Sequence, residues 1–226
     1  MYLICMKGYY NMDLTSPRTI RNIQEQFGFT FKKGLGQNFL TARNILEEIV
    51  DAAEIESGVI EVGPGFGVLT SELAQNSDKV VTIEIDERLI DVLDYTLAEY
   101  DNVKIINEDI LKLDLKKVID DEFKGEKVSI AANLPYYITT PIITKLLEEK
   151  LPIKNIVVMV QKEVAERMSA KPSTKDYGAI TVLCQYYTEP SIVANVPASL
   201  FVPPPKVDSA VLKLKVLDKP SVEVKD

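Results

Sequence analysis

A short apolar strand that runs into a glycine turn and then into a helix is the feature that most constrains this chain. Val59 to Val62 reads as a buried strand, glycines follow at positions 63, 65 and 67, and Val68 to Gln75 reads as a helix. Glycine suits such a turn because it adopts positive φ at little cost and lets a ligand lie against the backbone. Corners of this kind belong to doubly wound sheets, which bind ligands at the carboxyl ends of their strands. The spacing is not the dinucleotide pattern, and by itself it fits plain turn chemistry as well as a ligand site.

The rest of the chain alternates between strand and helix patterns. Strands are predicted over 58–62, 79–85, 103–107, 127–132, 155–161, 182–189 and 209–216, and helices over 15–26, 42–53, 68–75, 87–100, 140–150 and 162–169. This alternation predicts an α/β fold with a doubly wound, mostly parallel seven-stranded sheet and an N-terminal helical extension. The last two strands are joined by a proline-rich stretch too short for a crossover helix, so that pair is expected to be antiparallel. The layout is similar to that of the Rossmann-like class I methyltransferases, which use S-adenosylmethionine (SAM).

The composition excludes several kinds of catalytic and metal-binding site. The 226 residues contain no histidine, which removes histidine general bases and most zinc chemistry, and no metal is expected. Cys5 and Cys184 have no metal or redox spacing, and no apolar run is long enough to span a membrane. We therefore expect a cytoplasmic protein with reduced thiols.

Charge is unevenly distributed along the chain. The net charge of −8 argues mildly against a nucleic-acid partner. Residues 1–46, however, hold six Lys or Arg against two acids, as a basic face on an acidic body would. Lys32 and Lys33 lie in a stretch, 27–40, where aromatics, lysines and glycines interleave. This stretch is expected to be a loop that covers a pocket or touches RNA, although on charge alone a solvated N-terminal arm is the favoured interpretation.

Acidic residues follow the second and third predicted strands. Glu84 ends the second strand, where a carboxylate can accept hydrogen bonds from both hydroxyls of a ribose. Asp86 fits a helix N-cap better than a ligand contact. Asp109 follows the third strand and could accept from an adenine amine with Ile110 against the ring, or it could be an ordinary turn acid.

The fourth strand ends in Asn133-Leu134-Pro135-Tyr136, which is the most specific motif. An Asn oxygen and the carbonyl before a proline can both accept from an exocyclic amine and aim its lone pair at a methyl group. Pro135 holds Leu134 extended, and Tyr136 can stack on a base. We predict that these four residues are catalytic. Methyl transfer to an amine needs no general base, which agrees with the absence of histidine.

In combination, these motifs resemble those of the bacterial small-subunit ribosomal RNA adenine N6,N6-dimethyltransferases. The matching stretches are Gly34-Leu35-Gly36-Gln37-Asn38-Phe39-Leu40, Glu61-Val62-Gly63-Pro64-Gly65, Glu84-Ile85-Asp86, Glu108-Asp109, Asn133-Leu134-Pro135-Tyr136 and Phe201-Val202-Pro203-Pro204-Pro205-Lys206-Val207-Asp208-Ser209. The resemblance covers about residues 15–216.

The resemblance implies dimethylation of two adjacent adenines near the 3′ end of small-subunit rRNA, in an immature ribosomal subunit, by a monomer that uses SAM. The residues implied to contact SAM are Asn38, Leu40, Gly63, Glu84, Asp109 and Asn133. Tyr136 and Phe201 would sandwich the target adenine, and Lys32 and Lys33 would contact RNA phosphates. The expected divisions are an N-terminal arm and helix over 1–30, a methyltransferase domain over 31–216 and a tail or linker over 217–226. The small helical C-terminal domain of the family would be missing.

The sequence is also compatible with two other functions. A related enzyme class modifies one adenine of large-subunit rRNA and confers macrolide resistance, with similar fold and motifs. A ribosome-assembly factor that binds immature subunits, with methylation incidental, would use the same surface. An NAD-dependent oxidoreductase is disfavoured because the glycine spacing is wrong and the Asn133 motif would have no role.

Overall fold

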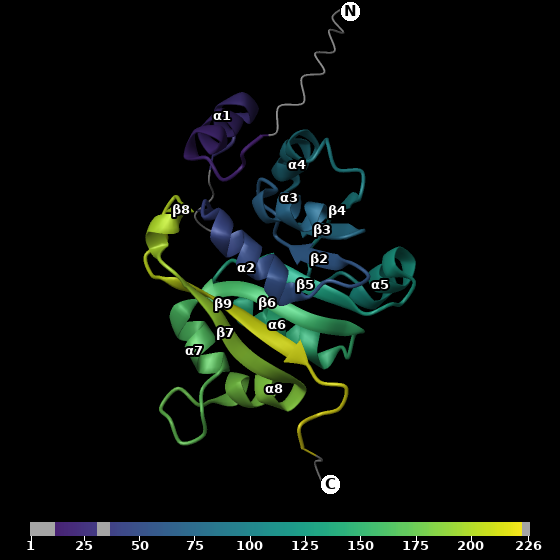
Figure 1. The fold of residues 1–226 in the computed structure, drawn as a ribbon, viewed down its shortest axis with the longest axis vertical. Coiled ribbons are helices and arrows are strands. Elements are labelled where there is room, and N and C mark those ends of the chain that lie inside the picture. Colours follow the sequence, from purple (N-terminus) through teal and green to yellow (C-terminus); the bar gives the residue numbers. More distant parts are fainter. Residues whose placement is uncertain (1–11, 31–36, 223–226) are drawn as a thin grey trace, which may run out of the picture.

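The computed structural model describes residues 12–30 and 37–222, and a seven-stranded sheet forms its centre (Figure 1). The strand order is β4-β3-β2-β5-β6-β9-β7. The bounds are β2 Val59–Val62, β3 Val80–Glu84, β4 Val103–Asn107, β5 Val128–Asn133, β6 Ile153–Gln161, β7 Thr188–Val196 and β9 Ser209–Val216. β2 to β6 pair in parallel, and β9 lies antiparallel between β6 and β7. The predicted mostly parallel sheet with an antiparallel final pair is confirmed.

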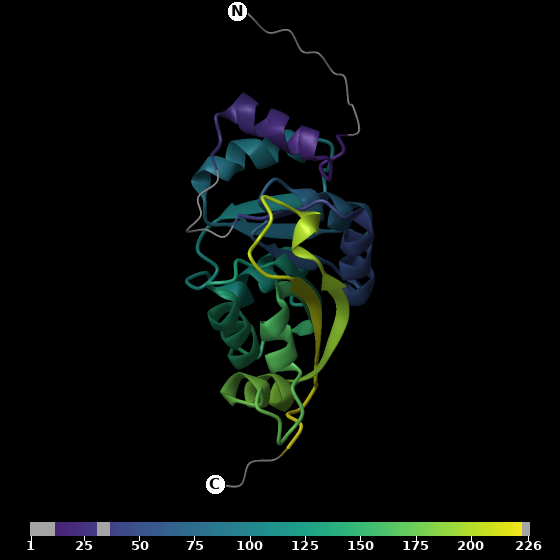
Figure 2. The ribbon, with the colours of Figure 1, turned by 90° about the vertical axis from the view of Figure 1, so that its left-hand side faces the viewer.

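Helices cover both faces of this sheet, as Figure 2 shows from the side. Their bounds are α1 Pro17–Phe27, α2 Arg43–Ala53, α3 Val68–Gln75, α4 Ile90–Thr96, α5 Leu115–Phe123, α6 Thr139–Glu148, α7 Lys162–Met168 and α8 Ala179–Tyr187. One apolar cluster packs the sheet against α5 to α8, and the other packs it against α1 to α4. β2 shows how a strand serves both clusters, since Ile60 and Val62 enter the first and Val59 enters the second.

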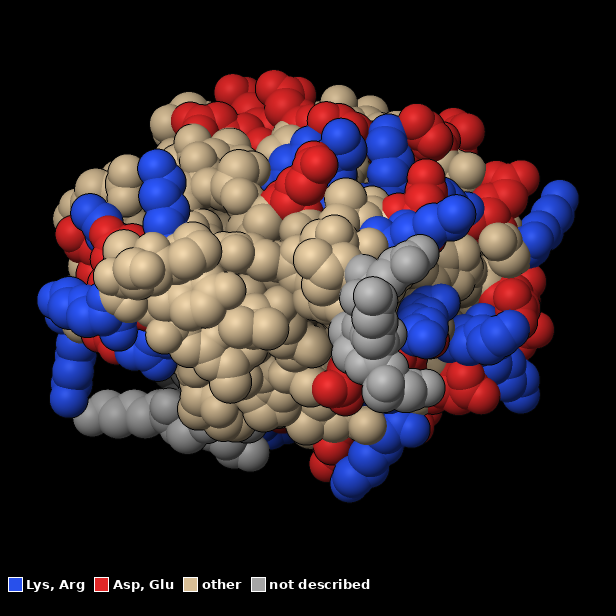
Figure 3. Space-filling view, turned by 90° about the horizontal axis from the view of Figure 1, so that it is seen from below, with Lys and Arg blue, Asp and Glu red and all other residues tan. Residues whose placement is uncertain are grey.

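The strand predicted over 182–189 is wrong, because residues 179–187 form α8 and the strand runs from Thr188 to Val196. α8 contains no charged residue, so no polar face marks its helical period. Figure 3 views this end of the molecule and shows a broad surface without Lys, Arg, Asp or Glu. Pro190, the residue after the predicted strand, is tolerated in β7 because β7 is an edge strand.

Helix α5 was not among the predicted elements, although its pattern is amphipathic. Leu115, Val118, Ile119 and Phe123 are buried on one face. Asp114 caps the helix by accepting a hydrogen bond from the Lys117 amide at 3.0 Å. No helix within residues 12–30 and 37–222 is long and apolar enough to cross a bilayer.

A second, two-stranded sheet joins distant parts of the chain beside the main sheet. β1 (Phe39–Leu40) pairs antiparallel with β8 (Phe201–Val202), and Leu40 lies opposite Phe201. Thr41 extends the contact, since both its amide and its hydroxyl donate to the Leu200 carbonyl, at 2.9 and 2.8 Å. This ladder fixes the segment after residue 37 next to the carboxyl edge of the main sheet.

Candidate active site

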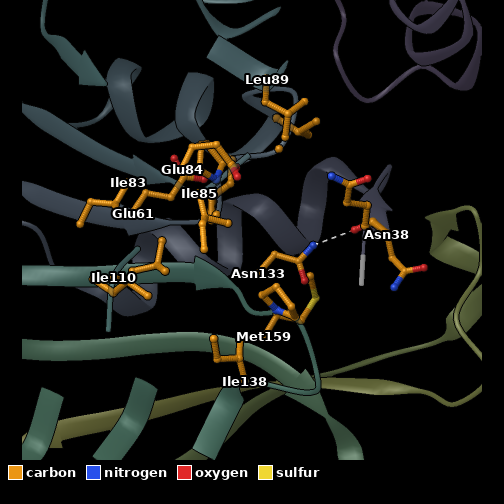
Figure 4. Close-up of a pocket in the computed structure, with 18 of the residues that line it drawn as sticks. Asn38, Glu61, Ile83, Glu84, Ile85, Leu89, Ile110, Asn133, Ile138 and Met159 are labelled. Carbon is orange, nitrogen blue, oxygen red and sulfur yellow. Dashed lines mark hydrogen bonds between the residues drawn. The ribbon is translucent and has the colours of Figure 1, made fainter. Parts of the chain in front are cut away.

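A cavity opens at the carboxyl ends of β2, β3 and β5, and Figure 4 shows the side chains around it. It encloses about 1030 Å³, including solvent at its mouth. β2 and β5 are neighbours in the sheet. β3 and β4 follow on the far side of β2, and β6 follows on the far side of β5, so the strand order reverses between them. Doubly wound sheets bind ligands at such a reversal. The sequence-predicted residues that line it are Asn38, Leu40, Gly63, Glu84, Asp109, Asn133 and Pro135.

The glycine turn forms one wall of the cavity. Gly63 has φ +71°, and a Cβ built on it would meet no atom within 4 Å, so its backbone faces open space. Gly65 has φ +61°, and a Cβ there would lie 2.6 Å from the Phe39 ring. Phe39 in turn stacks on Phe66 with 4.3 Å between ring centroids. Gly63 therefore leaves room for a ligand, whereas Gly65 makes room for the protein itself.

Glu84 lies at the end of β3 with 5% of its surface exposed. One carboxylate oxygen accepts a hydrogen bond from the Asp86 amide at 2.8 Å. Burial raises the pKa of Glu84 to about 7, partly offset by backbone amides, among them Gly65. Asp86 takes the N-cap role and also accepts from Arg88 Nε at 2.8 Å. The helix-cap alternative thus applies to Asp86, and the carboxyl group of Glu84 lines the cavity.

Glu61 is a further acid in this wall, and the sequence-based site did not include it. It is 1% exposed in the middle of β2 and lines the cavity. Burial raises its pKa to about 8, and the nearby charge of Glu84 adds to the rise. Its Oε2 atom has no hydrogen-bond partner among the described residues. A single charge inside an otherwise apolar strand was the available signal.

Asn133 ends β5 and reaches across the cavity to the N-terminal segment. Its Nδ2 donates to the backbone carbonyl of Asn38 at 2.9 Å (Figure 4). This bond fixes the orientation of the amide, and the Asn133 oxygen accepts no hydrogen bond from the described residues. Leu134 is 1% exposed, and its amide donates to the Met159 carbonyl at 3.1 Å. Leu134 can therefore offer the site only its backbone carbonyl.

The two aromatics assigned to the base make their contacts away from the cavity. The Tyr136 hydroxyl and the Ser209 hydroxyl are 2.7 Å apart and share a hydrogen bond. Phe201 is 2% exposed and packs in the apolar cluster on the α1 to α4 face. Neither residue lines the cavity in this structure.

Asp109 lies beyond β4 and takes part in a turn. Its Oδ1 accepts from the Leu111 amide at 3.0 Å, and Lys112 is 3.7 Å from Oδ2. The turn-acid and ligand interpretations therefore both apply, because Asp109 also lines the cavity. Lys32 and Lys33 lie outside the described residues.

Tyr137 is a second lining residue that the sequence-based site did not include. It follows Tyr136 directly, so the doubled tyrosine was its signal. Within the described ranges, no group of three or more His, Cys, Asp or Glu side chains is arranged to hold a metal ion.

Known proteins match this chain over most of its length. The model of the family described as "Ribosomal RNA adenine dimethylase" matches residues 28–226. The ribosomal RNA small subunit methyltransferases A of Bacillus mycoides (strain KBAB4) and Bacillus thuringiensis (strain Al Hakam) are each 55% identical to it over 217 residues. Each alignment covers 95% of this chain and 74% of the relative.

Two solved structures share both fold and sequence with the chain. A dimethyladenosine transferase from Plasmodium falciparum has a TM-score of 0.70 and 35% identity, covering 80% of this chain and 64% of that one. The 23S rRNA methyltransferase ErmE has a TM-score of 0.68 and 33% identity, covering 82% and 72%. The fold is thus that of the class I methyltransferases. Since the family match spans the whole sheet and the cavity at its edge, the chain belongs to the ribosomal RNA adenine dimethylase family.

Proposed function

We propose that this protein dimethylates the N6 amines of two adjacent adenines near the 3′ end of small-subunit rRNA, with SAM as methyl donor. One observation carries the proposal furthest. Three groups line one cavity: the Asn133 oxygen, which accepts no hydrogen bond from the described residues, the open backbone of Gly63 and the buried carboxyl of Glu84. A cavity with both a nucleoside-binding wall and an amine acceptor is suited to bring SAM and an adenine together.

The turn at Gly63 and the carboxylates of Glu84 and Asp109 are proposed to hold SAM. Glu84 would accept from the ribose hydroxyls, and Asp109 would accept from the adenine amine with Ile110 against the ring. The open space over Gly63 gives a ligand direct access to the backbone. Asn38 and Leu40 would contact SAM from the wall of the cavity at β1.

The Asn133 turn is proposed to hold the target amine. Bound SAM supplies a methyl group on a sulfonium, and transfer to N6 releases S-adenosylhomocysteine and a proton. The Asn133 oxygen and the Leu134 carbonyl accept from the amine, which turns its lone pair away from the ring and towards the methyl group. Because the Asn133 nitrogen is already bound to Asn38, the oxygen is held in place before the substrate arrives.

The target base is proposed to stack on Tyr136, with Phe201 on its other side. The bond to Ser209 restrains the Tyr136 ring, so less freedom is lost when a base stacks on it. Base stacking on an aromatic side chain contributes about 1–3 kcal/mol. The catalytic set is thus Asn133, Leu134, Pro135 and Tyr136, in a protein proposed to act as a cytoplasmic monomer on immature small subunits.

The close relatives favour the small subunit as the substrate. The 55% identical proteins are named small-subunit methyltransferases, whereas ErmE, a 23S rRNA methyltransferase, is 33% identical. Methylation of large-subunit rRNA is therefore the less favoured function, and the experiment below distinguishes it from methylation of small-subunit rRNA.

Mass spectrometry of rRNA tests the proposal directly. Unmethylated small and large subunits are incubated separately with the protein and SAM, and an Asn133→Ala variant serves as the inactive control. Dimethyladenine at two adjacent positions near the 3′ end of the small-subunit RNA is expected from the parent alone. Methylation confined to large-subunit RNA, or none in either RNA, would overturn it.

A further inference from the structure

Two successive tyrosines after β5 lie towards opposite halves of the candidate site. The Tyr136 hydroxyl bonds to Ser209 at the start of β9. Tyr137 lines the cavity together with Glu84 and Asp109, which follow β3 and β4. In the strand order, β9 lies on one side of β5 and the β3–β4 pair lies on the other. The Tyr136 ring therefore lies towards the part of the site proposed for the target base, and the Tyr137 ring lies towards the part proposed for the adenosine of SAM.

The charges around Tyr137 agree with this placement. Burial raises the pKa of its hydroxyl, and the negative charges of Asp109 and Glu84 raise it further. Those two carboxylates are the groups proposed to meet the ribose and the adenine of SAM. The Tyr137 ring thus lies close to the place where the adenosine would bind.

The Tyr137 side chain lines the cavity and is nevertheless exposed. It is 58% exposed, and the neighbouring rim residue Ile85 is 54% exposed. Apolar surface of this kind costs free energy in water and gains from a ligand that covers it. A flat aromatic ring can cover an adenine or a ribose by stacking.

We propose that Tyr137 is a cofactor-binding residue that closes over the adenosine half of bound SAM. The proposal rests on the proposed function, because it takes SAM as the ligand of this cavity. The two neighbouring tyrosines then bind different molecules, since Tyr136 contacts the target base and Tyr137 contacts the cofactor.

A tryptophan at this position gives a direct probe, because the chain contains no tryptophan. In a Tyr137→Trp variant all tryptophan emission comes from the rim of the cavity. Titration with S-adenosylhomocysteine is expected to change that emission with saturation. Tyr177→Trp is the matched control, since Tyr177 is 36% exposed and lies outside the cavity-lining set. Its emission should not respond.

Calorimetry of alanine variants measures how much Tyr137 contributes to S-adenosylhomocysteine affinity. Tyr137→Ala should weaken S-adenosylhomocysteine binding by about tenfold or more, the range of a lost stacking contact. 5′-Methylthioadenosine, which keeps the adenosine but lacks the amino-acid part, should lose affinity by a similar factor. Tyr177→Ala should bind both ligands like the parent, and urea unfolding of each variant checks that the fold is intact.

The outcomes separate this proposal from the one it rests on. If the parent does not bind S-adenosylhomocysteine, the cofactor assignment and the role of Tyr137 both fail. If the parent binds it, but Tyr137→Ala binds equally well or the tryptophan emission stays constant, only the role of Tyr137 is overturned. If 5′-methylthioadenosine affinity alone is unchanged, the ring does not cover the adenosine.

Discussion

The side-chain amide of Asn133 donates a hydrogen bond to the backbone carbonyl of Asn38, with 2.9 Å between the two atoms. The acceptor belongs to the main chain, so the bond does not depend on the Asn38 side chain. It orients the Asn133 oxygen, which is the atom proposed to accept from the target amine. The two asparagines that line the cavity are therefore proposed to have different roles, and substitution can separate them.

Asn133→Ala is expected to lower kcat for methyl transfer by about 10²-fold or more, since a positioned polar partner of the reacting group is lost. Asn38→Ala keeps the carbonyl and should act mainly on the KM for SAM. Steady-state kinetics on small-subunit RNA with both variants makes the comparison. Equal losses of kcat in the two variants would contradict the separate roles of the two asparagines.

The pH dependence of SAM binding should report Glu84. Burial raises the pKa of this carboxyl to about 7, so it is largely protonated at pH 6 and largely ionised at pH 8. Ribose hydroxyls bond better to the ionised form, and SAM affinity should therefore rise as the pH rises through about 7. Glu84→Gln should weaken binding by roughly 1.5–3 kcal/mol at pH 8 and remove the pH dependence. Calorimetry that finds a flat profile for the parent would rule out this role.

Stability should depend on pH through Glu61. Its pKa is raised from 4.5 to about 8 in the folded chain, so the folded state holds a proton that the unfolded state releases near 4.5. Its contribution is fully present below pH 4.5 and is lost as the pH rises through about 8. Between these values the free energy of unfolding should fall by up to about 1.4 kcal/mol per pH unit.

Glu61→Gln keeps the shape of the side chain and cannot ionise. Urea unfolding at pH 5 and pH 8 should therefore show a smaller difference for this variant than for the parent. Parallel pH curves for the two proteins would show that Glu61 is not the group responsible.

The glycines of the turn should respond differently to alanine. Both Gly63 and Gly65 have positive φ, where alanine costs about 1–2 kcal/mol. Gly65→Ala adds a clash with Phe39, so it should destabilise the fold further. Gly63→Ala meets open space and should weaken SAM binding more than it lowers stability. Thermal unfolding with and without S-adenosylhomocysteine distinguishes the two, and equal destabilisation would contradict the assignment.

Lys32 and Lys33 are still predicted to contact RNA phosphates. Each neutralised phosphate adds about 0.9 to the slope of log affinity against log salt on duplex nucleic acid. The double variant Lys32→Ala with Lys33→Ala should therefore give a shallower slope than the parent. Filter binding across a salt series measures it, and Lys116→Ala with Lys117→Ala is a matched pair on α5. A double variant that binds with the parent's slope would place the RNA surface elsewhere.

The parallel half of the sheet was predictable because its strands are mostly apolar and bounded by turn residues. Glu84 and Asn133 could be assigned to one edge from strand direction alone, since parallel strands present their carboxyl ends together. The switch from α8 to β7 was not predictable in the same way. Residues 179–187 carry no charge that would reveal a helical period, and Pro190 argues against a strand unless the strand is known to be at an edge.

The other features that the sequence did not predict depend on contacts between residues far apart in the chain. β1 and β8 are each two residues long, so neither has a periodic pattern of its own. The role of Glu61 depends on what surrounds it, because burial and the neighbouring Glu84 shift its pKa. The sequence shows Tyr136 and Tyr137 as adjacent tyrosines, and only the structure shows that Tyr137 lines the cavity while Tyr136 does not.

The ladder between β1 and β8 also sets an order of events during synthesis. Phe39 and Leu40 leave the ribosome early, but their partners Phe201 and Val202 are made near the end of the sheet-forming sequence. The wall of the site that holds Asn38 is therefore completed only after β7 has been translated and the chain has turned towards β9. Much of the parallel sheet can form before β8 has been translated, so the wall of the cavity at Asn38 is among the last parts of the fold to be completed.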